Sequence, residues 1–501
     1  MSSNTLQPQQ PEQQLEQQQQ PAAAAAAAIS HNNLDDDRPK NSSARLIRRY
    51  PKSNGTVPFI KFGPLFGQDE DFVKKAKEDA WQHVVSSSKS REAAVIEIYM
   101  SSLRQIENKA KASYDPDPVL DKLSNKDFRD TMLKDSCLFL QLSFSLLHGD
   151  DKLDAFPHLR NISLSNRHKW VESMFHVGNQ IPLVVLRVLL KKRYFQEVVK
   201  NGKWKEPSSD LAKMALFRLL LSPALDKPQR RIKVPSVRKH ARRLMHWTQQ
   251  LKECSDVLHG LHLLLLGPEI DPEKEEYDDD DVDLEEKNIG PDDKNGDTNN
   301  AQAGGSGCPE CGGAARDKAQ KEDDNDDDKK LKNAIKLKQA GVHFRVTKEG
   351  IRGIRFKSSL IYPKLSLPQL FVGSHTRLLL ECLKQYEQKL DPSLQEVSSY
   401  LQFMHDLVRT AQDAKILVSN GIIKGNRKYT QKLPAIFIDL APNDKITDTS
   451  LSPVKIEINS FYRPPWVSNY FTIVFVLSLI GLLVSIAQLV YAVLAYHKPP
   501  S

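Results

Sequence analysis

Cysteine is scarce in this sequence. The 501 residues include five cysteines, an odd number scattered along the chain. Secreted domains that depend on disulfides are far richer in cysteine and carry it in even numbers, so we expect no disulfide framework. Cys308 and Cys311 have the spacing of half a tetrahedral zinc site, but no second pair of ligands follows. Such a half-site could bind metal only by pairing between two chains, and we expect no metal site.

The common catalytic signatures are also absent. The sequence contains no P-loop, no dinucleotide fingerprint, no His-Glu-x-x-His and no Gly-x-Ser-x-Gly. Cys137 follows Asp135 by two residues, and on a helix these side chains point in different directions, so Cys137 is expected in the core. We expect no catalytic residue, no cofactor and no enzyme. The alternative is an enzyme with an unfamiliar site, whose pocket would gather several of the titratable groups Asp135, His148, His176 and Glu381.

No secretory signal is recognisable near the N-terminus. The apolar stretch Ala22 to Ile29 lacks the basic region and the longer, bulkier apolar region of a signal peptide. Residues 1–44 are otherwise rich in glutamine, alanine and proline, and they have too little apolar surface to offset the entropy of ordering. We predict a disordered tail over 1–44.

Charge is missing from one long stretch at the other end of the chain. Residues 471–496 form an uncharged run of 26 residues, where a bilayer core needs about 20 in a helix. Aromatic rings that favour the headgroup level lie toward both ends of this stretch, namely Trp466, Tyr470, Tyr491 and Tyr496. The pattern predicts a transmembrane helix over 469–496, followed by a short tail over 497–501.

The position of this span predicts a topology. A span that ends near the last residue leaves the ribosome late, so we expect a tail-anchored, single-pass protein of the plasma membrane or an endomembrane, with the bulk of the chain in the cytosol. Glycosylation motifs at Asn41, Asn54 and Asn161 would be used only if the topology were reversed. A receptor-like domain on the non-cytosolic side is therefore the alternative.

Small and polar residues recur within the span at steps of three and four. They are Ser478, Gly481, Ser485, Gln488, Ala492 and Ala495. This is a heptad seam of the kind that lets two helices approach closely, so it predicts a packing face for a second copy or for a partner's helix. The other interpretation is that small residues are simply common in membrane spans.

The remaining chain predicts a mainly α fold, built as one interrupted helical domain. Apolar residues follow helical spacing from Asp69 to Leu266, with Ser124 as an N-cap and Pro182 as a division, so the first part is placed at 45–267. The second part, 331–468, begins with alternating residues that predict a small antiparallel β element. Helices are then expected over 376–390, over 394–417 with Gly421 as its left-handed cap, and over 428–439.

The two parts are separated by an acidic insert over 268–330. Residues 269–328 hold 23 acidic and 6 basic residues and almost no bulky apolar side chain, which predicts disorder. The net charge of residues 269–328 is −17. Because the whole chain carries +8, the residues outside this segment carry +25.

The strongest positive bias lies just before the insert, in residues 187–252, with 18 basic and 4 acidic residues. Its two clusters comprise Lys191, Lys192 and Arg193, and Arg238, Lys239, Arg242 and Arg243. Anionic lipid is the partner we favour for this patch, and the acidic insert is a second candidate. Nucleic acid is an unlikely partner because no aromatic residues are interleaved. Ordinary solvated helix faces would also explain the charge.

Six blocks in order resemble the plant family called domain of unknown function 247. They are "FIKFGPLF" (59–66), "MLKDSCLFLQL" (132–142), "NQIPLVVLRVLL" (179–190), "AGVHF" (340–344), "YLQFMHDLVRTAQDAKILVSNGII" (400–423) and "NYFTIVFVLSLIGLLVSIAQLVYAVLAY" (469–496). The resemblance covers about Arg45 to Tyr496. It implies a plant membrane protein with a helical domain and a C-terminal anchor, and no reaction. Some grass members are associated with pollen–stigma self-incompatibility, so the resemblance also implies a recognition or scaffolding role.

Overall fold

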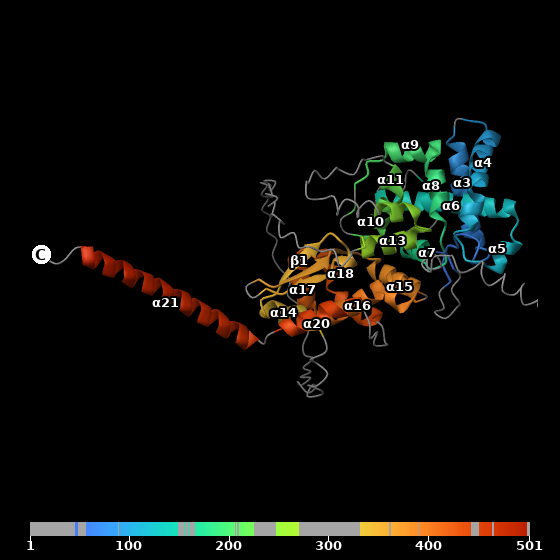
Figure 1. The fold of residues 1–501 in the computed structure, drawn as a ribbon. Helices are drawn as coiled ribbons and strands as arrows, with labels where there is room; N and C mark the ends of the chain where they lie inside the picture. Colours follow the sequence, from blue (N-terminus) through green and yellow to red (C-terminus); the bar gives the residue numbers. More distant parts are fainter. Residues whose placement is uncertain are drawn as a thin grey trace, which may run out of the picture.

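The computed structural model describes most of the two expected parts and the last helix (Figure 1). The described residues are 46–48, 57–88, 90–148, 156, 159, 166–205, 207, 210–224, 247–269, 331–359, 362–388, 390–441, 450–462 and 465–497, with side chains in the last helix described for 473–494. The expected disordered tail lies outside these ranges. So does the acidic insert, apart from Pro268 and Glu269.

The first part is helical, as its periodicity predicts. Its opening helices are α3 (Asp71–Ser86), α4 (Glu92–Lys111), α5 (Pro118–Lys122) and α6 (Asn125–His148). The backbone N–H of Asp127 donates to Ser124 Oγ at 3.1 Å, so the predicted N-cap of α6 is confirmed. Helix α6 is buried along most of its length because α3, α4, α8 and α10 pack around it.

Proline divides the next helical stretch, as expected. The elements are α7 (Arg167–Phe175), α8 (Leu183–Leu190), α9 (Arg193–Asn201), α10 (Leu211–Leu216), the π-helical turn η5 (Phe217–Leu221), α11 (Ser222–Ala224) and α13 (Val257–Leu266). Pro182 stands immediately before α8, where its missing N–H costs nothing. Asp256 caps α13 by accepting from the backbone N–H of His259 at 2.9 Å.

The β element is mixed rather than antiparallel. After α14 (Ala334–Gln339) come β1 (His343–Thr347), the 3-10 turn η7 (Ile351–Gly353), β2 (Arg355–Lys357), β3 (Lys364–Pro368) and β4 (Leu370–Val372). β3 lies between β1 and β2 and pairs antiparallel with β2 but parallel with β1, while β4 pairs parallel with β5 (Ile423–Gly425). Alternating apolar residues determine which face of a strand is buried, but they carry no information on strand direction, which explains the difference.

The remaining helices complete the second part. They are α15 (Thr376–Glu387), the turn η8 (Pro392–Leu394), α16 (Glu396–Leu407), α17 (Ala411–Ser419), α18 (Arg427–Thr430), α19 (Leu433–Leu440) and α20 (Ser452–Phe461). The single helix expected over 394–417 is wrong, because Val408 leaves the helical conformation and Thr410 starts α17 with a capping box to Asp413. Gly421 adopts φ +71°, the left-handed conformation expected after this stretch.

One hydrophobic core joins the two parts across the insert. Buried residues from Ile47 to Ile458 form a single cluster, and α7, α10 and α13 of the first part contact α15 and α16 of the second. The mainly α fold class is therefore confirmed. Gly267, the last residue before the insert, has φ +78°, and a Cβ there would lie 1.9 Å from the carbonyl oxygen of Glu349. Only glycine allows so close an approach of the two parts.

Helix α21 (Pro465–His497) projects away from the rest of the molecule (Figure 1). Its segment Ile473–Leu494 spans 22 residues and is long and apolar enough to cross a membrane, and none of it is buried inside the protein. At about 1.5 Å per residue, such a segment is about 33 Å long, close to the thickness of a bilayer core.

Candidate functional site

A buried polar cluster holds the extended segment that precedes α3. The ammonium of Lys77 lies 2.6 Å from Asp69 and 2.5 Å from Asp135, and all three side chains are buried. The second oxygen of Asp135 accepts from the backbone N–H of Gly63 at 2.7 Å. The cluster thus connects α3 and α6 to the segment around Gly63.

Asn179 holds the same segment from the other side, and Gln180 joins its neighbour Tyr114. Asn179 accepts from the backbone N–H of Phe62 at 2.7 Å and donates to the carbonyl oxygens of Ile60 (2.8 Å) and Ser173 (2.7 Å). The carbonyl oxygen of Gln180 accepts from the hydroxyl of Tyr114 at 3.0 Å. Three of the sequence blocks, those that begin at residues 59, 132 and 179, therefore meet in one place.

The electrostatics of this cluster indicate a structural role. Burial raises the pKa of Asp135 to about 6, and the adjacent Lys77 ammonium partly offsets that effect. Burial also raises the pKa of the Cys137 thiol, which lies next to this cluster on α6, so the thiol stays protonated and is a poor nucleophile. The charged groups of the cluster are paired with one another and with a backbone amide, an arrangement that stabilises the fold.

A second buried polar cluster joins the two parts of the chain. Glu387, fully buried at the end of α15, accepts from the backbone N–H of Val397 (2.8 Å) and from both the backbone N–H (2.7 Å) and the hydroxyl (2.9 Å) of Ser398. It therefore caps the first turn of α16. His262 of α13 reaches across the interface to the same carboxylate at 2.8 Å.

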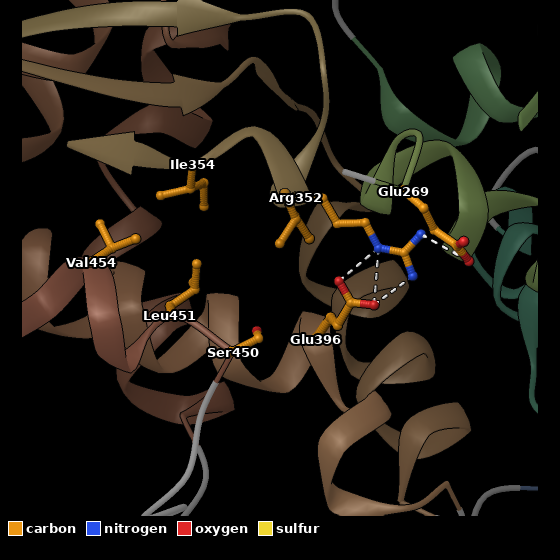
Figure 2. Close-up of a pocket in the computed structure, with 8 residues that line it drawn as sticks. Glu269, Arg352, Ile354, Glu396, Ser450, Leu451 and Val454 are labelled. Atoms are coloured by element: carbon orange, nitrogen blue, oxygen red, sulfur yellow. Dashed lines mark hydrogen bonds and ion pairs between the residues drawn. The ribbon is translucent and has the colours of Figure 1, made fainter. Parts of the chain in front are cut away.

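A pocket of about 430 Å³ opens beside the start of the insert (Figure 2). Ile351, Ile354, Leu451 and Val454 form its apolar wall, and Ser450, Arg352, Glu269 and Glu396 complete the lining. The Arg352 guanidinium binds Glu396 through two N–H groups, at 2.5 and 2.8 Å, and lies 3.8 Å from Glu269. Burial alone would lower the pKa of Arg352, but the two carboxylates outweigh burial and raise it. The polar end of the pocket is thus an already satisfied ion pair.

The four groups expected for an unfamiliar active site lie in different surroundings. Asp135 belongs to the Lys77 cluster, His148 packs on Trp204 with 3.9 Å between ring centroids, and His176 stands edge-on to Phe66 at 5.4 Å. Glu381 lies half-buried on α15. The pocket in Figure 2 is lined by none of them.

In the first cluster of the expected basic patch, Lys192 is partly buried and the other two residues are exposed. Lys192 donates to the hydroxyl of Ser102, and its partial burial lowers its pKa. Arg193 pairs with Glu197 at 2.9 Å, and Lys191 is exposed between α8 and α9. The second cluster, Arg238, Lys239, Arg242 and Arg243, lies outside the described residues, so the patch as a whole stays a prediction.

The predicted seam in α21 lies on an exposed helix. The hydroxyls of Ser478 and Ser485 donate to carbonyl oxygens of their own helix, those of Val474 (2.8 Å) and Gly481 (2.9 Å). Gly481 has no neighbour that an added Cβ would touch. The side chains of Gln488 and Ala492 are exposed, and Ala495 lies in the helix just beyond the described side chains. Pairing along this face stays a prediction.

Metal-binding clusters of three or more suitable side chains are absent from the described ranges. Cys308 and Cys311 lie outside them. The remaining cysteines, Cys137, Cys254 and Cys382, are buried and unpaired with one another. Sequence reasoning missed the pocket residues Glu269, Arg352 and Glu396, because their proximity depends on how the chain returns across the insert, and no local pattern signals it.

Comparisons with known proteins agree with the sequence blocks. The DUF247 family profile, described as plant protein of unknown function, matches residues 46–495. The resemblance stated from the blocks is therefore confirmed. No curated protein and no solved structure matches this chain.

Proposed function

Because this chain belongs to the DUF247 family of plant proteins of unknown function, we propose a role in recognition or scaffolding at a membrane rather than in a reaction. In this proposal α21 anchors the protein by a single pass, and the helical body presents surfaces to partners in the cytosol. The observation that carries the proposal is the apolar segment Ile473–Leu494, which is wholly exposed and matches a bilayer core in length.

The buried polar clusters support a binding role over catalysis. Lys77 with Asp135, and His262 with Glu387, are buried titratable groups of the kind that a catalytic site uses, and each pair joins one element to another. Buried polar clusters that join elements in this way keep exposed surfaces in fixed positions, which a recognition module requires.

Protease protection on sealed membranes tests the topology. Full-length chain carrying a C-terminal epitope is inserted into microsomes and then treated with protease from outside. We expect the body to be digested and a small fragment containing α21 and the epitope to survive. Asn161→Gln serves as the matched control, because it removes a glycosylation motif and should leave the mobility of the chain unchanged. A protected body with an added glycan at Asn161 would instead support the receptor-like alternative.

Cross-linking in intact membranes tests the recognition role. The full-length chain is compared with the anchor alone, residues 463–501, expressed at the same level. We expect partners that depend on the body to be captured by the full chain and not by the anchor. Identical partner sets for both would contradict a recognition role for the body.

A further inference from the structure

The outer face of the three-stranded sheet is positively charged. Strand register places His343, Lys364 and Lys357 in one row across β1, β3 and β2, and Arg345, Ser366 and Arg355 in the next. The residues between these rows, Phe344, Leu365 and Phe356, are buried and pack on the core. Since side chains alternate along a strand, the two polar rows share the solvent side. We call these six residues the basic sheet face.

Acidic residues are nearly absent from this part of the chain. Residues 331–366 contain nine basic residues and one acidic residue, Glu349. Glu349 lies 3.2 Å from Arg355 at one edge of the basic sheet face. Residues 331–366 therefore carry a clear excess of positive charge.

An aromatic ring accompanies the charge. Tyr362 is 42% exposed and stacks on His343, with 3.8 Å between ring centroids and 19° between planes. The Lys364 ammonium lies 5.2 Å from the same ring. Tyrosine next to lysine is the combination that favours the headgroup level of a bilayer, where the ring is partly dehydrated and the ammonium meets phosphate.

The sheet lies next to the segment that leads into α21. Phe356, on the inner side of β2, contacts Phe461 at the end of α20, with 5.4 Å between ring centroids. Pro465 begins α21 four residues later, and the apolar segment begins at Ile473. Eight helical residues cover about 12 Å, whereas the headgroup layer on each side of a bilayer core is about 5 to 8 Å thick. The short connection keeps the β element within reach of the bilayer surface.

We propose that the basic sheet face lies against the anionic lipid headgroups of the membrane that holds α21. The inference rests on the anchoring in the proposed function and adds a surface and a ligand chemistry to it. Attraction between basic residues and an anionic leaflet acts within a Debye length of about 8 Å, which the short connection allows. The acidic insert is the competitor, because Glu269 lies beside Arg352 at the edge of the same element. The exposed Tyr362 favours lipid over the acidic insert, because an aromatic ring gains from the partly dehydrated headgroup level but gains nothing from contact with carboxylates.

Lysine reactivity in nanodiscs tests the proposal. Full-length protein is reconstituted in discs of phosphatidylcholine alone, or with about a third phosphatidylserine, and acetylated briefly before mass spectrometry. We expect labelling of Lys357 and Lys364 to fall at least threefold in anionic discs at low salt and to recover in about 0.5 M salt, where screening is strong. Lys200, exposed on α9 in the first part, is the internal control and should not change.

A charge-reversal variant tests whether the protection of Lys364 from acetylation depends on the charge of the basic sheet face. Arg345→Glu with Lys357→Glu changes two residues of the face whose side chains are not part of the core, and Lys364 remains as the reporter. We expect its protection by anionic lipid to be lost, whereas the matched variant Lys109→Glu with Lys200→Glu should keep it.

Three results would overturn the proposal. Equal reactivity of Lys357 and Lys364 in both lipids, at the level of Lys200, would show that the face does not meet the membrane. Equal protection in both lipids, removed by deleting residues 270–330, would assign the face to the insert. Failure of the chain to remain in any disc would remove the membrane anchor itself, and with it the proposed function, whereas the first two results leave the anchor standing.

Discussion

Lys77 shows how single buried charges determine the stability of this fold. Its ammonium is shared by Asp69 and Asp135, and removing it would leave two carboxylates buried without a counter-charge. We predict that Lys77→Met lowers the free energy of unfolding by about 3 to 5 kcal/mol, measured by urea denaturation. Adding Asp135→Asn should recover part of this loss, because it removes one of the two carboxylates that lack a counter-charge. Strictly additive effects of the two substitutions would contradict the direct pairing.

Glu107 gives the chain a stabilising ion pair whose effect depends on pH. Burial alone would raise its pKa, but Arg129 and Lys111 outweigh burial and hold the pKa below the ordinary value of 4.5. A lowered pKa stabilises the fold above the unfolded-state value, and this contribution is lost as the pH falls through the folded-state value.

We therefore predict that Glu107→Gln costs about 1 to 3 kcal/mol at pH 7. The difference from wild type should shrink steadily below about pH 4.5, which urea denaturation at several pH values measures. A difference that stays constant down to pH 3 would show that packing, and not charge, explains the loss.

At the scale of elements, α16 depends on a carboxylate from the preceding helix. Glu387 receives hydrogen bonds from Val397, Ser398 and His262 in a fully buried position. We predict that Glu387→Gln lowers the free energy of unfolding by about 2 to 4 kcal/mol, because an amide replaces one acceptor oxygen with a donor that faces other donors. Glu381→Gln, half-buried on the same helix, is the control and should change stability by less than about 0.5 kcal/mol. Equal effects of the two would contradict the capping role.

Helix content was predictable because it depends on local periodicity, whereas strand pairing and the break between α16 and α17 were not. The apolar spacing of α4 and the N-cap Ser124 of α6 are legible in the sequence, and both are confirmed. The apolar pattern does not reveal the break between α16 and α17, because buried Leu407, Ala414 and Leu417 keep nearly helical spacing across it. The pairing of β4 with β5 joins residues about fifty positions apart, and no local signal records it.

The candidate site was predictable only in part. The segment joined to Asp135 and Asn179 could be found from the sequence because each lies in a recognisable block. The basic sheet face could be anticipated in part from the sequence, because polar residues alternate with apolar ones at His343 and Arg345 and at Arg355 and Lys357. How these residues line up in rows depends on the strand order, which the sequence does not show. The pocket around Arg352 required the tertiary fold, because its lining combines Glu269, at the start of the insert, with residues of the second part as far apart as Ile351 and Val454.

At the scale of the whole molecule, the core predicts that the two parts fold together. Contacts of α7, α10 and α13 with α15 and α16 leave neither part with a separate core. We predict a single unfolding transition in urea, seen equally by fluorescence and by circular dichroism. Replacing residues 270–330 with a flexible linker a quarter as long should stabilise the fold by about 1 kcal/mol through a smaller loop-closure cost. Two separate transitions would show that the parts fold independently.

The central claim is that α21 holds a folded helical body at a membrane. Alkaline carbonate extraction of membranes from plant cells tests it, with full-length chain compared to a chain that ends at Tyr462 and to a variant carrying Leu482→Arg and Ile486→Arg. We predict that the full-length chain stays in the membrane pellet, whereas the shortened chain and the variant appear in the supernatant, because charged residues at the centre of a span are costly. Full extraction of the wild-type chain by carbonate would contradict the anchor and the account built on it.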